Sequence, residues 1–352
     1  MASSSDVRST RVLSRALAAP EQSGGRRGGD AREAGDAPGG AAVPDHPALR
    51  ALLGALMSAG PAATSGGWRL ADGCVQITQR AGFDPIRVRL QAADSVAAWR
   101  EVLTVSALAL DVLAVVIDGF AGDGGEVRLV RCADILDAKG RRRLGEERQA
   151  QEAQVARELM HLGAFVLGSE EQPVFSVVPV GGDRPTSFVV SLDPQVRAAW
   201  ADAPLRRVNW RLLQFDHRTN RGADVLAKKL GIYFSLAGSR TRPAVRSVRS
   251  VLKAIGAAGE LAGGARGGRL ADRFEEALLR LDERGLFAVG YRGGRIPGME
   301  DGRMKGWVKR WLDTDLVIVP HDQGLSRPRG LPLANAALAA SADLPQLSWG
   351  RA

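Results

Sequence analysis

Arginine and lysine side chains are concentrated in one stretch of the 352-residue chain, residues 204–321. That stretch holds 23 lysines and arginines against 12 aspartates and glutamates, a surplus of 11 positive charges. The whole chain has a net charge of +9, so the residues outside the stretch sum to −2. Guanidinium groups bind phosphate through paired hydrogen bonds, and ammonium groups act on it as point charges. This concentration therefore indicates the binding of a polyanion, and of a nucleic acid in particular.

The candidate DNA-contacting residues fall on two predicted helices with their approaches and on the turn-rich segment that follows. They are Arg240, Arg242, Arg246, Arg249 and Lys253, then Arg266, Arg269, Arg273 and Arg280, then Arg295, Arg303, Lys305 and Lys309. We expect Arg269 or Arg273, at the start of the helix predicted over 270–284, to read a base. The first helix and the turn-rich segment are expected to contact phosphates. Glu275 and Glu276 on the second helix make a solvated charged face the alternative interpretation.

A second group of residues has the types that DNA strand-transfer enzymes use. Asp216, His217 and Arg218 precede Tyr233, and such enzymes combine a tyrosine nucleophile with arginine or histidine partners. The order and spacing do not match the recombinase pattern, and Tyr233 stands between Ile232 and Phe234 in an apolar run. We therefore predict that the chain has no catalytic residue and is not an enzyme. A tyrosine-type strand-transfer enzyme remains the alternative from another functional class.

Other cofactor and metal chemistry lacks a pattern in the sequence. No phosphate-binding loop of the form Gly-x4-Gly-Lys-Ser/Thr occurs. The four histidines are scattered, and Cys74 and Cys132 are too far apart for a metal or redox motif. We expect no cofactor and no metal, and two reduced cysteines in a cytoplasmic protein. No run reaches the ~18 apolar residues of a membrane span, so no membrane association is expected.

Two successive segments show the same predicted order of helices and strands. The first has helices at 102–120, 133–139 and 146–162 and strands at 127–130, 165–167, 174–179 and 187–191. The second has helices at 221–237, 245–255 and 270–284 and strands at 286–291 and 316–320. A sequence of helices followed by a hairpin is typical of a winged helix, a variant of the helix-turn-helix arrangement.

The third helix of the second segment has a one-sided apolar stripe. It consists of Leu270, Phe274, Ala277, Leu278 and Leu281, a spacing that predicts burial of one face, and Gly285 is placed to end the helix. Trp307 and Trp311 lie one helical turn apart, which favours core packing over a stacking platform for single-stranded bases.

The predicted fold class is α+β, with tandem winged-helix domains and a disordered N-terminal tail. The expected divisions are a disordered tail at 1–46, a helix-plus-hairpin segment at 47–94, a first winged-helix-like domain at 95–203, a basic second winged-helix domain at 204–321 and a loosely ordered tail at 322–352. The first tail is rich in Gly, Ala, Ser, Pro and charge, a composition that cannot bury enough apolar surface to order itself.

About a third of the chain, residues 215–320, resembles plasmid replication initiators and related helix-turn-helix proteins of mobile elements. The matching residues are Ala227-Lys228-Lys229-Leu230-Gly231, Arg246-x-x-Arg249-x-x-Leu252, Arg273-Phe274-Glu275-Glu276-Ala277-Leu278-x-x-Leu281-x-x-x-Gly285 and Trp307-x-x-x-Trp311-Leu312-Asp313-Thr314, followed by Leu316-Val317-Ile318-Val319-Pro320. The resemblance implies tandem winged helices that bind repeated DNA sequences at an origin and recruit host replication proteins.

The sequence thus predicts a sequence-specific protein that binds double-stranded DNA, and the resemblance makes DNA replication of a plasmid or other mobile element its expected role. A transcriptional regulator with the same DNA-binding module is the alternative within the binding class. Host replication proteins and a second copy of the chain are further candidate partners.

Overall fold

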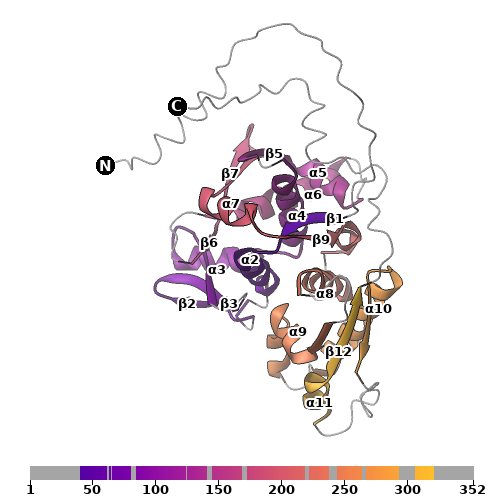
Figure 1. Cartoon of the computed structure of the whole chain (residues 1–352). Helices are drawn as coiled ribbons and strands as arrows, with labels where there is room; N and C mark the ends of the chain where they lie inside the picture. The colour runs from indigo at the N-terminus through magenta and orange to yellow at the C-terminus, as the bar shows by residue number, and fades with distance from the viewer. Residues whose placement is uncertain are drawn as a thin grey trace, which may run out of the picture.

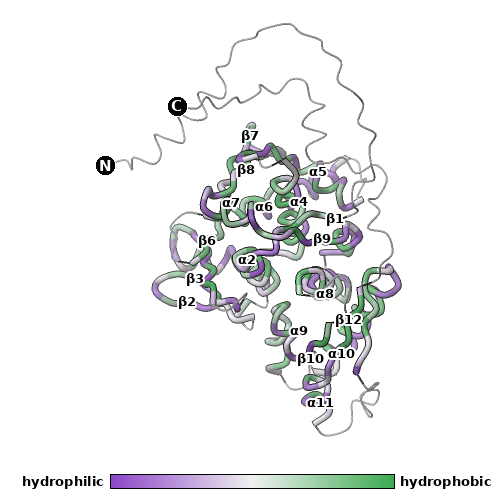
Figure 2. The backbone as a smooth tube through the Cα atoms, viewed as in Figure 1, coloured by the Kyte–Doolittle hydropathy of each residue, from purple (hydrophilic) through white to green (hydrophobic). Residues whose placement is uncertain are grey.

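The computed structural model describes residues 40–61, 63–64, 66–80, 85–123, 125–140, 145–168, 173–218, 222–237, 244–263, 267–292 and 306–320. These residues form a mixed α+β protein whose small sheets are antiparallel (Figure 1). We divide it into an N-terminal unit, residues 40–218, and a C-terminal unit, residues 222–320. The helix α4 (Leu108–Asp123) of the N-terminal unit and the strand β12 (Asp315–Pro320) of the C-terminal unit are rich in hydrophobic residues (Figure 2).

The first described strand pairs with a strand far along the chain. All five residues of β1 (Gly40–Pro44) are buried, and they pair with β9 (Leu205–Asn209). The backbone N–H of Ala42 also donates a hydrogen bond of 2.6 Å to Oδ1 of Asp118 in α4. The composition of residues 1–46 predicts a disordered tail, because it supplies too little apolar surface to order itself, and for Gly40–Pro44 this prediction is wrong. Pairing with β9 and packing on α4 order these residues.

The next elements form a four-stranded sheet under a helix. The strands β2 (Arg69–Ala71), β3 (Cys74–Arg80), β4 (Pro85–Leu90) and β6 (Phe165–Leu167) lie in that order. Asp72, with a φ of 54°, and Gly73, with a φ of 72°, make the turn between β2 and β3. The apolar helix α2 (Pro47–Ser58) packs on β3 and β4. Because β6 pairs with β4, strand pairing crosses the boundary that the sequence analysis placed at residue 94.

One predicted helix is two helices in the structure. The sequence predicts a single helix over 102–120, whereas α3 (Ser95–Thr104) ends before α4 begins at Leu108. Oγ of Ser106 accepts a hydrogen bond of 3.2 Å from the N–H of Leu108 and donates one of 2.6 Å to Oε1 of Glu158. Ser106 therefore caps the start of α4 while it is held by α6 (Glu146–Leu162).

The rest of the N-terminal unit runs helix, strand, helix, helix, strand, strand. These elements are α4, β5 (Val127–Arg131), α5 (Cys132–Ala138), α6, β7 (Phe175–Val180) and β8 (Ser187–Leu192). The last strand lies in the middle of the sheet, in the order β5-β8-β7. The helix α7 (Pro194–Ala201) and the 3-10 turn η1 (Trp210–Gln214) complete the unit on either side of β9.

The C-terminal unit has a similar order, with a further helix between its last two strands. It consists of α8 (Ala223–Ala237), β10 (Ala244–Ser247), α9 (Val248–Ala254), the 3-10 turn η2 (Ala258–Gly263), α10 (Gly267–Glu283), β11 (Phe287–Tyr291), α11 (Trp307–Asp313) and β12. The last strand again lies in the middle, in the order β10-β12-β11. The predicted helix 245–255 begins later than expected, because Val245 pairs with Val317 in the sheet and Ser247 caps α9 at Ser250 N–H.

The predicted apolar stripe of α10 is confirmed. Its five members, Leu270, Phe274, Ala277, Leu278 and Leu281, are all buried. Gly285 has a φ of 62° directly after the helix, a conformation that favours glycine.

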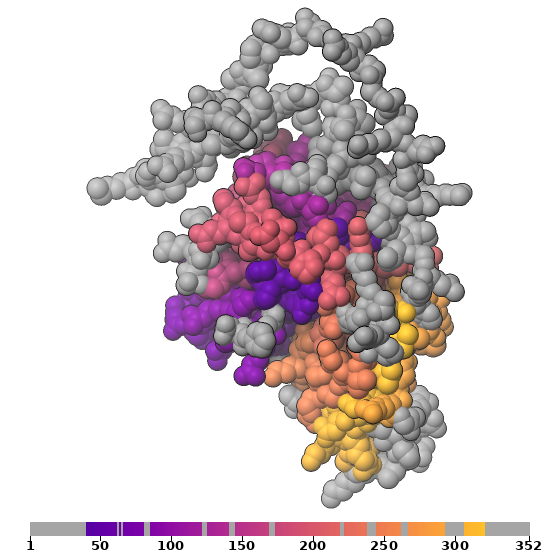
Figure 3. Space-filling model, in the orientation of Figure 1, coloured from indigo at the N-terminus to yellow at the C-terminus, as the bar shows by residue number. Residues whose placement is uncertain are grey.

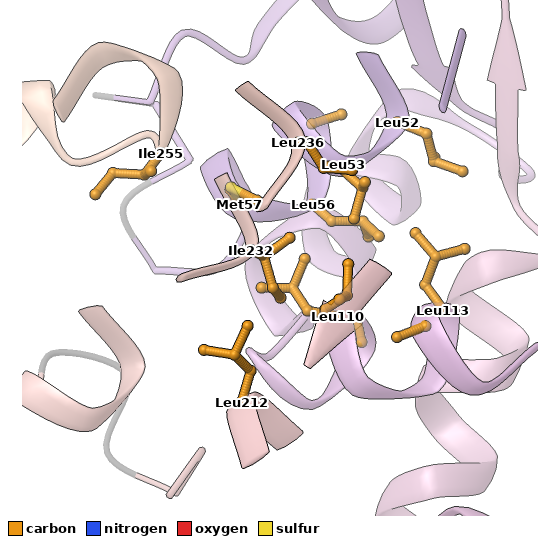
Figure 4. Packing of buried hydrophobic residues seen from close by; sticks show 14 of the residues in the cluster. Leu52, Leu53, Leu56, Met57, Leu110, Leu113, Leu212, Ile232, Leu236 and Ile255 are labelled. Carbon is orange, nitrogen blue, oxygen red and sulfur yellow. The ribbon is translucent and has the colours of Figure 1, made fainter. Parts of the chain in front are cut away.

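The two units share one apolar core at α8. Side chains of α2, α4, η1 and α8 meet there, as Figure 4 shows for Leu56, Leu110, Leu212 and Ile232. At Gly256, whose φ is +73°, an added Cβ would come 2.5 Å from Cα of Ser58 at the end of α2. The backbones of the two units therefore touch at this point.

Buried charges also cross the junction between the units. Nζ of Lys228 in α8 lies 2.6 Å from Oδ2 of Asp111 in α4, and Nζ of Lys139 contacts the same oxygen. None of the three side chains is exposed. Nζ of Lys139 also donates a hydrogen bond of 2.8 Å to the carbonyl of Leu213.

Candidate nucleic-acid interface

Seven of the thirteen predicted DNA-contacting residues lie in the part of the chain that the structure describes. They are Arg246, Arg249, Lys253, Arg269, Arg273, Arg280 and Lys309. The other six lie outside the described residues, namely Arg240, Arg242, Arg266, Arg295, Arg303 and Lys305.

Two arginines of α10 are engaged by carboxylates of the same unit. Arg273 forms an ion pair with Glu260 of η2, and Arg280 forms ion pairs with Asp224 of α8 and Glu276. Burial alone would lower the pKa of Arg280, but hydrogen bonds to the two carboxylates outweigh it and raise that pKa. The ion pairs with Glu260 and Asp224 link α10 to η2 and to α8. The structure thus gives a structural role to two residues that the sequence singled out for DNA.

The solvent-facing side of α10 is acidic. Asp272, Glu276 and Glu283 are exposed at spacings of four and seven residues, and Leu279 between them is 55% exposed. These residues repeat along one face of a helix. A duplex against the middle of this face would bring phosphates close to carboxylates, which repels it.

Five of the seven exposed lysines and arginines that the structure describes in the C-terminal unit lie instead on α9, the start of α10 and α11. Arg249 of α9 pairs with Asp313 of α11 at 2.7 Å. A Cβ added to Gly267, at the start of α10, would come 3.0 Å from Cγ2 of Val308 in α11. We call this region the α9–α11 surface. Its exposed basic residues are Arg249, Lys253, Arg269, Lys309 and Arg310. Arg310 is a member that the sequence analysis did not select.

The α11 part of this surface lies at the far end of the C-terminal unit, whereas the end of α9 lies near the N-terminal unit. Figure 1 places α9 and α11 away from α5, α6 and α7, and in Figure 3 the orange and yellow C-terminal unit projects from the N-terminal unit. A long duplex could therefore approach the α9–α11 surface from outside the molecule.

The two tryptophans of α11 belong to the core, as predicted. Trp311 is fully buried, and its ring meets Phe274 edge-on with centroids 5.7 Å apart. Its Nε1–H donates a hydrogen bond of 2.8 Å to the Tyr291 hydroxyl, which donates one of 2.9 Å to Oε1 of Glu275. Trp307 is also buried. Neither indole offers an open face on which a base could stack.

The residues of the strand-transfer alternative have other roles. Arg218 pairs with Asp216 at 2.7 Å, His217 is buried, and Tyr233 packs beside the ring of Phe234 with centroids 5.9 Å apart. Within the described ranges, no three His, Cys, Asp or Glu side chains form a group suited to a metal.

Membrane-span criteria are met by no single helix among the described residues. The segments Ser95–Thr104 and Leu108–Ala121 reach the required length and hydropathy only as a pair, and they are bent by 89° relative to each other.

Comparisons with known proteins gave few matches. No protein-family model matches the sequence, and no curated protein matches it. Among solved structures, a crystal structure of RctB domains 2-3 is similar at a TM-score of 0.41 and 11% identity, covering 76% of this chain and 96% of that one. A crystal structure of selenomethionine derivatives of domains 2 and 3 of RctB gives 0.42 and 10%, with coverages of 75% and 98%. At TM-scores below 0.5, this likeness carries no inference about fold or function.

Proposed function

We propose that the chain is a sequence-specific duplex DNA-binding protein built from two winged-helix units, in which the C-terminal unit contacts DNA. The support for the fold is the order helix, strand, helix, helix, strand, strand, which both units share apart from β6 before β7 and α11 between β11 and β12. The last strand lies in the middle of each three-stranded sheet. This is the arrangement of a helix-turn-helix variant that inserts a helix into the major groove and sets its hairpin on the backbone.

Charge distinguishes the two units at equivalent positions. Lys253 and Asp137 occupy equivalent positions in the two units. Each stands six residues after the end of the first strand of its three-stranded sheet, β10 for Lys253 and β5 for Asp137. Asp137 pairs with Arg148 at 3.2 Å. The short helix after the first strand is thus basic in the C-terminal unit and acidic in the N-terminal unit. Of these two short helices, we therefore assign contact with phosphates to the one in the C-terminal unit.

The observation that carries the proposal is the α9–α11 surface. Its lysines and arginines converge from three elements at an exposed end of the molecule. Arg269 stands in the first turn of α10, where a recognition helix first enters a groove and where the helix dipole favours phosphate. In this arrangement Arg269 is the base-reading residue, and Lys253 and Lys309 contact the backbone. Glu276 lies two turns further along the same face, so only the first turn of α10 is proposed to enter the groove.

A binding experiment on the full chain tests this assignment. Fluorescence anisotropy with a labelled duplex, measured between about 50 and about 200 mM salt, should show a loss of affinity of orders of magnitude for wild type. Lys253→Gln and Lys309→Gln should each weaken binding to any duplex and reduce the salt slope by about 0.9. Arg157→Gln, at an exposed arginine of α6, removes the same charge and should change neither value. Wild type without duplex affinity at low salt would refute the function.

The cellular role proposed is initiation of replication on a plasmid or other mobile element, without catalytic activity. It is supported by the sequence resemblance over residues 215–320. Under this role, a plasmid whose only origin is the DNA flanking the gene should replicate when the chain is supplied in trans. The same plasmid should not be maintained when the chain supplied in trans carries both Lys253→Gln and Lys309→Gln. Maintenance without the chain, together with repression of a flanking promoter by it, would favour a transcriptional regulator.

A further inference from the structure

A cleft of about 320 Å³ lies between the two units and is lined by three arginines. Arg50 of α2 and Arg80 at the end of β3 come from the N-terminal unit, and Arg246 of β10 comes from the C-terminal unit. No aspartate or glutamate is among the described residues that line it. Asp45, outside the lining, pairs with Arg50, and the two other guanidinium groups make the site positive.

The three arginines differ in how they are held. Nε of Arg50 donates a hydrogen bond of 2.8 Å to Asp45, which also accepts one of 2.7 Å from Nε of Arg206. Burial would raise the pKa of Asp45, but the two arginines outweigh it and lower that pKa. One carboxylate thus faces two guanidinium groups, which leaves a positive surplus at this wall of the cleft.

The other two arginines of the cleft, Arg80 and Arg246, are exposed to solvent. Arg246 is exposed, and its guanidinium donates to the carbonyls of Val245 at 2.8 Å and of Ala237 at 3.5 Å. Arg80 is exposed at the last residue of β3. Backbone carbonyls do not neutralise a guanidinium, so the charge of Arg246 remains available to an anion.

The rest of the lining is suited to a ligand with polar and apolar parts. Leu53, Met57 and Leu236 supply apolar surface, and Tyr233 and Gln79 supply polar groups. The Gln79 amide lies against α2, because a Cβ added to Gly54 would come 2.9 Å from its Oε1. A cavity of this size is in the range that accommodates a nucleotide-sized group.

The cleft adjoins the α9–α11 surface. Ala254, the last residue of α9, lines the cleft, and Lys253 directly before it belongs to the α9–α11 surface. A duplex held by α9 therefore has the cleft at its side, and the four-stranded sheet of the N-terminal unit supplies the opposite wall.

We propose that this cleft receives phosphate groups of the DNA backbone, held between Arg80 and Arg246 with Arg50 behind them. The proposal rests on the proposed duplex binding, and it adds the N-terminal unit to the interface through β3. Arg80 is a binding residue that the charge count of residues 204–321 could not reveal, because it lies outside that stretch.

Duplex binding by the full chain with matched single substitutions tests the cleft. Arg80→Gln should lower duplex affinity about three- to tenfold at about 100 mM salt and reduce the salt slope by about 0.9, the value for one phosphate contact. Arg80→Lys should retain part of the affinity, because a point charge is kept. The control is Arg69→Gln, which removes one charge from an exposed arginine of β2 in the same sheet and should leave both values unchanged.

The outcomes separate this proposal from the proposed function. If Arg80→Gln behaves as Arg69→Gln while Lys253→Gln weakens binding, the cleft assignment fails and duplex binding stands. If wild type does not bind a duplex, both fail. Pyrophosphate, added alone, should raise the melting temperature of wild type only weakly. Saturable pyrophosphate protection that Arg80→Gln abolishes, with duplex affinity unchanged, would assign the cleft to a small phosphate compound and overturn its assignment to DNA.

Discussion

Nζ of Lys228 lies 2.6 Å from Oδ2 of Asp111, a residue 117 positions earlier in the chain, and neither side chain is exposed. Lys139 shares the same carboxylate. The C-terminal unit is therefore joined to the N-terminal unit through buried charges as well as through apolar packing. A fragment of residues 204–321 would expose Lys228 without its partner, so binding experiments belong on the full chain.

Asp111→Asn should destabilise the protein by about 3–5 kcal/mol, because it leaves two buried lysines without a counter-charge. The free energy of unfolding is measured by urea denaturation. Asp137→Asn breaks a partly exposed ion pair with Arg148 and should cost about 1 kcal/mol or less. Equal costs for the two variants would mean that the carboxylate of Asp111 does not hold the junction.

The stability of the protein should rise with pH above neutrality. Burial lowers the pKa of Lys228 to about 7, with Asp111 opposing and Lys139 adding to the decrease. The lysine in the unfolded chain has the ordinary value of 10.5. Between these values the unfolded state binds more protons than the folded state, so the free energy of unfolding increases with pH. Below about pH 7 both states are protonated, and the contribution no longer changes.

Lys228→Met isolates this effect. It should make the increase between pH 7 and pH 9 smaller by about 2 kcal/mol, leaving the part due to Lys229, whose pKa burial lowers to about 8 against the opposing charge of Glu260. Identical pH profiles for wild type and Lys228→Met would contradict the assignment.

Phe274→Ala should cost about 3–5 kcal/mol, because the ring is fully buried and meets Trp311 edge-on. Leu279→Ala on the same helix is the control, since that side chain is 55% exposed and should change stability by about 0.5 kcal/mol or less. Thermal unfolding of the two variants measures the difference. An unchanged melting temperature for Phe274→Ala would show that α10 is in another register.

Gly256→Ala should destabilise the protein by about 2 kcal/mol or more. The residue has a φ of +73°, and its Cβ would come 2.5 Å from Cα of Ser58; strain and collision add. Gly285→Ala serves as the comparison, because its φ is +62° with no atom within 4 Å of the added Cβ. It should show the conformational cost alone, about 1 kcal/mol. A smaller loss at Gly256 than at Gly285 would mean that the units are not in contact there.

Wild type, Tyr233→Phe and Tyr291→Phe should all form no covalent adduct with DNA, because neither hydroxyl is proposed as a nucleophile. Tyr291→Phe should still cost about 1–2 kcal/mol of stability, since it removes the acceptor of the buried Trp311 N–H. Denaturing gel electrophoresis after incubation with DNA checks for a covalent adduct. An adduct that Tyr233→Phe abolishes would establish strand-transfer chemistry.

The sequence predicted what depends on local periodicity. The stripe of α10 and the burial of Trp311 follow from helical spacing alone, and the structure confirms both. It did not predict the break between α3 and α4, because Ser106 acts as a cap only in the presence of Glu158, 52 residues later. A local signal was present for the turn between β2 and β3, since Asp-Gly at residues 72–73 is a strong hairpin dipeptide.

The candidate site was predicted only in part, for a similar reason. Counting charges identified the basic stretch but could not tell Arg269 from Arg273. That distinction depends on Glu260, which the fold brings to Arg273 from η2. The same holds for the cleft, whose arginines come from α2, β3 and β10 and share no sequence pattern.

The pairing of β1 with β9 also sets an order of events during synthesis. Nη1 of Arg207 and the carbonyl of Gly40 are 167 residues apart in the chain, yet they are joined by a hydrogen bond of 3.2 Å. At translation rates of about 5–20 residues per second, β1 waits roughly ten to thirty seconds for its partner strand to be made. The helix α4, on which β1 packs, is synthesised within that interval. Among the strands that the structure describes, the first to be synthesised thus pairs only after most of the N-terminal unit has been made.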